Sequence, residues 1–180
     1  MNRMVEGVTG LIVSAGGSTR MGQPKGLLLW KGVPLLRAQV LALQAVGLPV
    51  TVVLGCRTAE HLAVLPPGVR VVLNPRWAQT DMAASVALAL AGPMLLQPVD
   101  VPPPTVETLR LLLSVQQDAV PQFAGGDGHP VRLQPPHLPG RLDLRLAGAR
   151  RIPVRDPHCV RNLNRPADWE EWLSAEGEAG

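Results

Sequence analysis

The sequence predicts a single α/β domain in which helices cover both faces of a mostly parallel sheet. Short apolar runs alternate with helical stretches along the 180-residue chain, and this spacing implies crossover connections between parallel strands. The apolar runs lack the polar alternation of half-exposed strands, as is typical of buried parallel strands. With 46% hydrophobic residues the chain can bury a sizeable core. We therefore expect one three-layer α/β/α domain that spans residues 1–180.

The first half of the chain predicts three strands and two helices. Each strand is an apolar or β-branched run that ends at a glycine-rich turn, a glycine, or an Asn-Pro pair. The first helix begins near Pro34 and ends at Gly47, which follows the preference for proline at helix starts and glycine after helix ends. In order, we expect a strand at 8–14, a helix at 34–46, a strand at 49–54, a short helix at 58–65 and a strand at 69–73.

The second half starts regularly and then becomes less regular. Asp81 is a suitable N-cap for an Ala- and Leu-rich helix. In order, we expect a helix at 81–91, a strand at 93–99, a helix at 104–115, and two short strands at 120–124 and 130–133 around a turn at 125–129. A loop at 135–140, a helix at 142–146, a strand at 152–154 and a closing helix at 167–175 complete the prediction.

Composition and charge exclude several classes of protein. The net charge is +3, and the basic residues are scattered rather than gathered in a stripe, so we expect no nucleic-acid partner. No apolar run reaches membrane-spanning length, so we expect no membrane association. Cys56 and Cys159 lack metal-type spacing and indicate thiols in a reducing compartment. These features together predict a cytoplasmic protein.

Residues that could bind a ligand or take part in catalysis follow four of the predicted strands. They are 14–25, 55–57, 74–81 and Asp100. In an open α/β sheet, ligands bind beyond the carboxyl ends of the strands. We therefore expect these segments to meet at one edge of the sheet and to form the functional site there.

The segment 11–25 reads LIVSAGGSTRMGQPK and predicts a polyphosphate site. Small residues directly after a strand let the backbone approach a ligand and turn its N–H groups toward it. Arg20 and Lys25 add two cations to this loop. The loop is not a P-loop, because Gly22 is followed by Gln23-Pro24 rather than by Lys-Ser or Lys-Thr. It is not a dinucleotide fingerprint either, because its glycines have the wrong spacing and Pro24 interrupts any helix there.

This string resembles the signature of the MobA-like nucleotidyltransferases, which attach CMP or GMP to molybdopterin. Further segments are similar to elements of that family, among them 25–29, 32–36, 74–85, 100–102, 128–130, 148–150 and 162–166. The resemblance implies a Rossmann-like nucleotidyltransferase fold and a Mg²⁺-dependent enzyme. Two departures stand out: Asp81 is found where glycine is usual, and Asn164 replaces an aspartate expected to help hold the metal.

The resemblance also implies roles for individual residues. Arg20, Lys25 and Asp100 are the expected catalytic residues, and Asp100 with Asn164 is the expected Mg²⁺ site. The nucleotide is expected to lie against Ser14, Ala15, Gly16, Gly17, Arg20, Lys25, Gly55 and Asp100. The second substrate is expected to contact Asn74, Ser85 and His129.

The resemblance favours CTP as the nucleotide, GTP as a close alternative, a phosphorylated acceptor such as molybdopterin, and a molybdoenzyme as partner. Two further alternatives stay open at this point. One is a sugar-1-phosphate nucleotidyltransferase, since its attacking group is also a phosphate. The other is a non-catalytic chaperone that binds a nucleotide or cofactor, because Asn162 and Asn164 replace two expected carboxylates.

Overall fold

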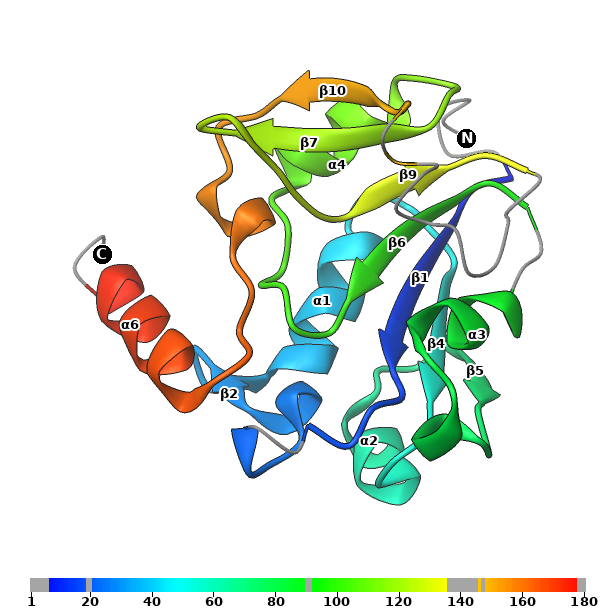
Figure 1. Ribbon diagram of the computed structural model, residues 1–180, viewed down its shortest axis with the longest axis vertical. Coiled ribbons are helices and arrows are strands. Elements are labelled where there is room, and N and C mark those ends of the chain that lie inside the picture. Colours follow the sequence, from blue (N-terminus) through cyan, green and yellow to red (C-terminus); the bar gives the residue numbers. More distant parts are fainter. Residues whose placement is uncertain (1–6, 19–20, 90–91, 136–145, 147, 178–180) are drawn as a thin grey trace.

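An eight-stranded sheet forms the centre of the computed structural model (Figure 1), which describes residues 7–18, 21–89, 92–135, 146 and 148–177. Its strands are β1 (Thr9–Ser14), β4 (Val50–Leu54), β5 (Arg70–Leu73), β6 (Met94–Pro98), β7 (Ala119–Phe123), β8 (Gly126–Asp127), β9 (Val131–Leu133) and β10 (Arg150–Pro153). The order is β10-β7-β9-β6-β1-β4-β5, with β8 paired to β7. Only β8 and β9 run antiparallel to their neighbours within this sheet. The predicted class, α/β with a mostly parallel sheet, is confirmed.

The helices follow the predicted ones closely; the first four are shorter than predicted, and the closing helix is longer. They are α1 (Leu35–Gln44), α2 (Thr58–Val64), α3 (Met82–Ala87), α4 (Val106–Leu113) and α6 (Pro166–Gly177), together with the 3₁₀ turns η3 (Lys25–Leu27), η4 (Trp77–Gln79) and η5 (Pro157–Val160). The expected N-cap at Asp81 is confirmed, since its carboxylate accepts a hydrogen bond from the N–H of Ala84. Residues 90–91, 136–140 and 142–145 of the predicted helices and loop lie outside the described residues.

Two clusters of buried side chains place the helices on opposite faces of the sheet. On one face, Leu36 and Val40 of α1 and Leu109 of α4 pack with Ile12 and other strand residues. On the other face, Val86 of α3 belongs to the cluster that contains the alternate residues Leu11, Val13 and Leu96 of the strands. Because neighbouring strand residues point to opposite faces, β1 is buried on both sides, and the three-layer arrangement follows.

A small hairpin that the sequence pattern does not predict lies directly after the glycine-rich loop. Strands β2 (Leu29–Trp30) and β3 (Val33–Pro34) pair antiparallel around Lys31 and Gly32, whose positive φ angles of 49° and 77° suit a tight two-residue turn. The Trp30 ring stacks on Trp172 of α6 at 5.6 Å between centroids. Helix α6 and the segment that leads into it are thereby fixed beside the loop.

The strand order creates a switch point at β1. From β1 the chain proceeds to β4 and β5 on one side and to β6 on the other, and all of these contacts are parallel. Crevices form at the carboxyl ends of strands where the order reverses in this way, and ligands bind there. Among the helices in the described ranges, none combines the length and the apolar character that crossing a bilayer requires.

Candidate active site

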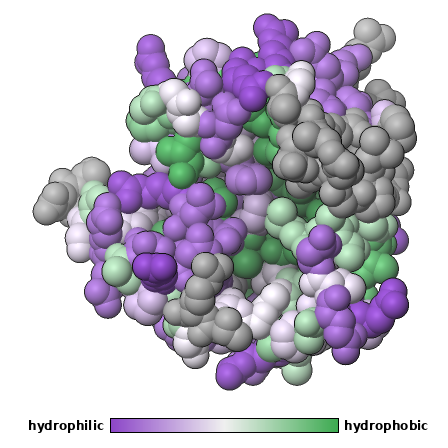
Figure 2. Space-filling model, viewed as in Figure 1, coloured by the Kyte–Doolittle hydropathy of each residue, from purple (hydrophilic) through white to green (hydrophobic). Residues whose placement is uncertain are grey.

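A cavity of about 270 Å³ lies at the carboxyl ends of β1 and β6. It is lined by Val13, Ala15, Gly16, Ser18, Lys25, Trp77, Thr80, Asp81, Met82, Ser85, Pro98, Val99, Asp100 and Asn164. Figure 2 shows this face of the molecule hollowed near its centre, with hydrophobic surface in the hollow and hydrophilic surface around it. The predicted meeting of segments 14–25, 74–81 and Asp100 at one edge of the sheet is therefore observed.

The glycine-rich loop forms one wall of this cavity. The carbonyl of Ala15 accepts a hydrogen bond from the N–H of Cys56 at 3.0 Å, and the N–H of Lys25 donates to Ser18 Oγ at 3.2 Å. These bonds hold both ends of the loop. A side chain at Gly55 would meet the Ala15 carbonyl and Trp77 at 2.5 Å, so glycine is required there by close packing. Gly55 therefore supports the loop and does not itself line the cavity.

Other predicted nucleotide-binding residues have different positions. Ser14 is buried at the end of β1, whereas Gly16 is exposed at the cavity. Gly17 is half-buried and is not among the lining residues. Arg20, predicted to contact the leaving phosphates, lies outside the described residues.

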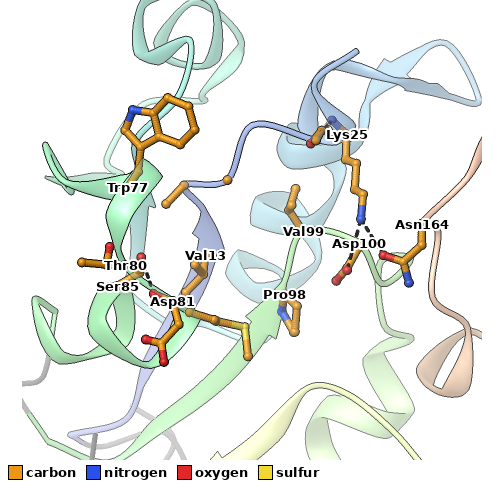
Figure 3. Close-up of a pocket in the computed structure, with 14 residues that line it drawn as sticks. Val13, Lys25, Trp77, Thr80, Asp81, Ser85, Pro98, Val99, Asp100 and Asn164 are labelled. Carbon is orange, nitrogen blue, oxygen red and sulfur yellow. Dashed lines mark hydrogen bonds and ion pairs between the residues drawn. The ribbon is translucent and has the colours of Figure 1, made fainter. Parts of the chain in front are cut away.

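Lys25 joins two segments that are far apart in sequence. Its ammonium group lies 3.3 Å from Asp100 Oδ2 and donates to Asn164 Oδ1 at 2.7 Å (Figure 3). The C-terminal segment is anchored there, because the N–H of Leu163 donates to the Asp100 carbonyl at 2.7 Å and Asp168 accepts from the N–H of Asn164. The predicted catalytic lysine and the two predicted metal ligands thus form one cluster at one end of the cavity.

Two buried glutamines that the sequence analysis did not single out hold the turn that carries Asp100. The amide nitrogen of Gln39, on α1, donates to the carbonyls of Pro98 and Val101. The amide nitrogen of Gln97, on β6, donates to the same two carbonyls and to that of Pro102. Both side chains are fully buried. They bind the residues before and after Asp100 and thereby fix the place of its carboxylate.

Asn74 and Ser85, predicted to contact a second substrate, form a buried network instead of two independent contacts. The Asn74 amide donates to Thr80 Oγ1 at 2.9 Å and to Ser85 Oγ at 3.0 Å. Its carbonyl oxygen accepts from the N–H of Arg76 at 3.0 Å. Asn74 does not line the cavity, whereas Thr80 and Ser85 do. Asn74 therefore holds one wall of the cavity in place from behind, and Ser85 is part of the surface that faces the cavity.

His129, the third residue predicted for the second substrate, lies at the antiparallel strand β9. Its N–H donates to the Cys159 carbonyl at 2.8 Å, and its ring hydrogen-bonds the backbone of Leu96. The side chain is not among those that line the cavity, so its contact with a substrate stays a prediction. Burial lowers the pKa of His129, and the nearby Asp100 carboxylate and the Leu96 hydrogen bond oppose this shift without cancelling it.

The lowered pKa of His129 predicts a loss of stability in mild acid. The unfolded chain takes up a proton near the ordinary pKa of about 6.5, whereas folded His129 does so only at lower pH. The free energy of unfolding therefore falls as the pH drops from about 6.5 toward the folded pKa. We expect His129→Gln to show a smaller loss between pH 7.5 and 5.0 in urea unfolding. Between pH 7.5 and 9 the free energy of unfolding should change with pH in the same way in wild type and in the variant. An equal loss of this free energy between pH 7.5 and 5.0 in the two proteins would contradict the prediction.

The fold and this site define the class of an α/β nucleotidyltransferase. The chain belongs to the MobA-like NTP transferase domain family, whose model matches residues 10–158. It is 34% identical over 109 residues to a molybdenum cofactor guanylyltransferase of Xanthomonas euvesicatoria pv. vesicatoria (strain 85-10). That match covers 61% of this chain and 55% of the relative, so the chain spans about half the length of the relative it matches.

Solved structures show the same fold. A homologue of Mycobacterium tuberculosis Rv0371c from mycobacterium sp. strain JC1 superposes with a TM-score of 0.80 at 25% identity, over 96% of this chain and 98% of that one. A nucleotidyl transferase from Methanothermobacter thermautotroptrophicus gives a TM-score of 0.79 at 23% identity, over 97% and 99% of the two chains. The family and the fold predicted from the glycine-rich string are both confirmed.

Proposed function

We propose that this protein transfers a nucleotidyl group from CTP or GTP to a phosphorylated acceptor of the molybdopterin type and releases pyrophosphate. The observation that carries this proposal is the cluster of Lys25, Asp100 and Asn164 at the end of a cavity walled by the glycine-rich loop. A cation beside exposed loop backbone suits a triphosphate, and the apolar part of the cavity suits a base. The similarity to a molybdenum cofactor guanylyltransferase supports the acceptor class.

The reaction is an in-line displacement. An oxygen of the acceptor phosphate attacks the α-phosphorus of the nucleotide, and the bond to the departing pyrophosphate breaks. The protein contributes by aligning the two phosphates and by stabilising the charge that they carry. Lys25 is placed to neutralise the α-phosphate, and its short bond to Asn164 holds the ammonium in a single place. Arg20 lies outside the described residues, and its contact with the leaving phosphates stays a prediction.

The donor set at Asp100 and Asn164 fits Mg²⁺. One carboxylate and one amide oxygen lie within reach of the same ammonium, and both are hard oxygen donors. Mg²⁺ commonly binds one or two carboxylates and takes its remaining ligands from phosphates and water. When bound, the ion would supply positive charge at the reacting phosphates.

The proposal is tested by incubating the protein with molybdopterin, Mg²⁺ and each of CTP, GTP, ATP and UTP. We expect pyrophosphate release and a dinucleotide product detectable by mass spectrometry. Thermal shifts with the same nucleotides report binding alone. If none of the four nucleotides shifts the unfolding temperature, the proposed function is wrong.

The neutral side chain of Asn164 motivates a second candidate, a non-catalytic chaperone that binds a nucleotide or a nucleotide cofactor. Such a protein would show the thermal shift without turnover. Sustained pyrophosphate release would exclude it. An Asn164→Asp variant that gains activity over a measurable basal rate would identify an enzyme with a weakened metal site.

Replacing Gln39 by Met tests whether its hydrogen bonds to the backbone on either side of Asp100 position the Asp100 carboxylate. The variant keeps the volume but removes the donors to the Pro98 and Val101 carbonyls. We expect turnover to fall about 10–100-fold with a nearly unchanged KM for the nucleotide, because supporting hydrogen bonds at metal sites have effects of this size. Pyrophosphate release is measured against Mg²⁺ concentration. Gln44→Met, on the same helix but away from the cavity, is the matched control and should behave as wild type.

A further inference from the structure

Asp81 places a carboxylate on the side of the cavity opposite Lys25. It lines the cavity together with Trp77, Thr80 and Ser85, whereas Lys25, Asp100 and Asn164 lie across from it (Figure 3). At one end the Asp100 carboxylate is paired with the Lys25 ammonium, whereas at the other end the Asp81 carboxylate has no cationic partner among the described residues. This difference constrains how a nucleotide can lie in the cavity.

The Asp81 carboxylate is held by a capping contact. Its Oδ1 accepts from the N–H of Ala84 at 2.9 Å, which fixes the side chain at the start of α3. Asp81 is exposed, and among the described residues no bond to its Oδ2 is found. Each carboxylate oxygen can accept two hydrogen bonds, so Oδ1 keeps one acceptor site beside the helix cap and Oδ2 keeps both for a ligand.

The phosphates of a nucleotide belong at the Lys25 end. A carboxylate repels phosphate, and the Ala84 N–H at the start of α3 is already occupied by that carboxylate. A ligand group that approaches Asp81 must therefore be a hydrogen-bond donor without negative charge. With the triphosphate near Lys25, the group that reaches the opposite end is the edge of the base, and Trp77 and Val13 supply apolar surface for its ring.

The wall beside Asp81 also offers acceptors rather than donors. Thr80 Oγ1 accepts from the Asn74 amide and donates its own proton to the Arg76 carbonyl at 3.0 Å. Ser85 Oγ accepts from the same amide and lies 3.5 Å from the Asp81 carbonyl, to which it donates. Because both hydroxyl protons are used inside the wall, Thr80 and Ser85 can accept hydrogen bonds from N–H groups of a base but have no proton of their own to donate.

We propose that Asp81 is a specificity-determining residue that selects guanine, an inference that rests on the proposed function. Guanine presents two adjacent donors, N1–H and the N2 amino group, and a carboxylate accepts both. Cytosine and adenine present one amino group beside a ring nitrogen lone pair, which a carboxylate repels. Uracil presents one N–H between two carbonyls. Glycine is usual at this position in the family. The carboxylate that replaces it here changes the expected nucleotide from CTP to GTP.

The test compares nucleotide affinities of the full chain by isothermal titration calorimetry in the presence of Mg²⁺. The probes are GTP, CTP, UTP, inosine triphosphate (which lacks only the N2 amino group) and tripolyphosphate. The variant is Asp81→Ser, whose hydroxyl can still cap α3 but which lacks the charged second oxygen. Thr105→Ala removes the equivalent cap from α4, which is not part of the cavity, and is the matched control.

We expect wild type to bind GTP at least about tenfold more tightly than inosine triphosphate or CTP, as one good pair of base contacts would give. In Asp81→Ser this preference should disappear, while tripolyphosphate binding is unchanged or improved. Thr105→Ala should keep the wild-type preference. Equal affinity of wild type for GTP and inosine triphosphate, or an unchanged preference in Asp81→Ser, would overturn the inference and leave the proposed function intact. Failure of wild type to bind any nucleotide would overturn both.

Discussion

Replacing Asp100 by Asn is expected to lower the rate of nucleotidyl transfer by about 10³-fold or more. Asp100 is the one carboxylate that approaches Lys25 within the described part of the chain, and it is the only charged donor proposed for Mg²⁺. The amide keeps the shape of the side chain and can still accept from Lys25, but it carries no charge. Bound metal typically contributes several kcal/mol of charge stabilisation, and each 1.36 kcal/mol is about tenfold in rate. Pyrophosphate release at saturating nucleotide measures the effect.

The neighbouring amide offers a rescue experiment for this prediction. Asn164 Oδ1 and Asp100 Oδ2 contact the same ammonium group, so a carboxylate at position 164 would lie beside the same site. We expect the double variant Asp100→Asn, Asn164→Asp to recover part of the lost rate and to need more Mg²⁺ than wild type. Asp127→Asn is the control, because Asp127 pairs with Arg151 outside the cavity. Near-wild-type turnover of Asp100→Asn alone would contradict the assignment of Asp100.

The fold could be predicted from sequence where local patterns decide it. The apolar runs that became β1, β4 and β6 are buried along their length, so their composition reports their place directly. The hairpin of β2 and β3 was missed because two-residue strands are too short to show any periodicity. The antiparallel direction of β9 depends on pairing with β6 and β7, which are distant in sequence, and no local pattern encodes it.

The site was predictable only in part, and for a similar reason. Lys25 and Asp100 follow strand ends, where the topology of an open sheet places ligands. The contact of Lys25 with Asn164 joins residues 139 positions apart. The family resemblance indicated Asn164 only as a metal ligand beside Asp100, and no local pattern indicated its bond to Lys25. Gln39 and Gln97 look like ordinary polar residues in a helix and a strand, because burial is a property of the packed fold. Asp81 was predicted as a helix cap at the end of a segment expected at the site, and the structure shows that its side chain lines the cavity.

Replacing Lys25 by Met is expected to have opposite effects on two measurable quantities. Turnover should fall about 10²–10³-fold, which is the usual loss when one fixed donor to a transition-state oxyanion is removed. The side chain is only 12% exposed and lies close to two oxygens, so its position is tightly defined. Lys25→Arg should not restore the rate, because the larger, planar guanidinium cannot take the place of a compact ammonium at 2.7 Å from Asn164.

Binding of a divalent cation without nucleotide should change in the other direction. In wild type the Lys25 ammonium lies beside the same two oxygens that are proposed for Mg²⁺, and like charges repel. Removing it should tighten the binding of Mn²⁺, used as a paramagnetic substitute, to the nucleotide-free protein. A variant with both slower turnover and weaker Mn²⁺ binding would indicate a merely structural role for Lys25. Slower turnover with tighter Mn²⁺ binding is the result expected when the ammonium and the metal lie close together, because loss of one cation then removes repulsion on the other.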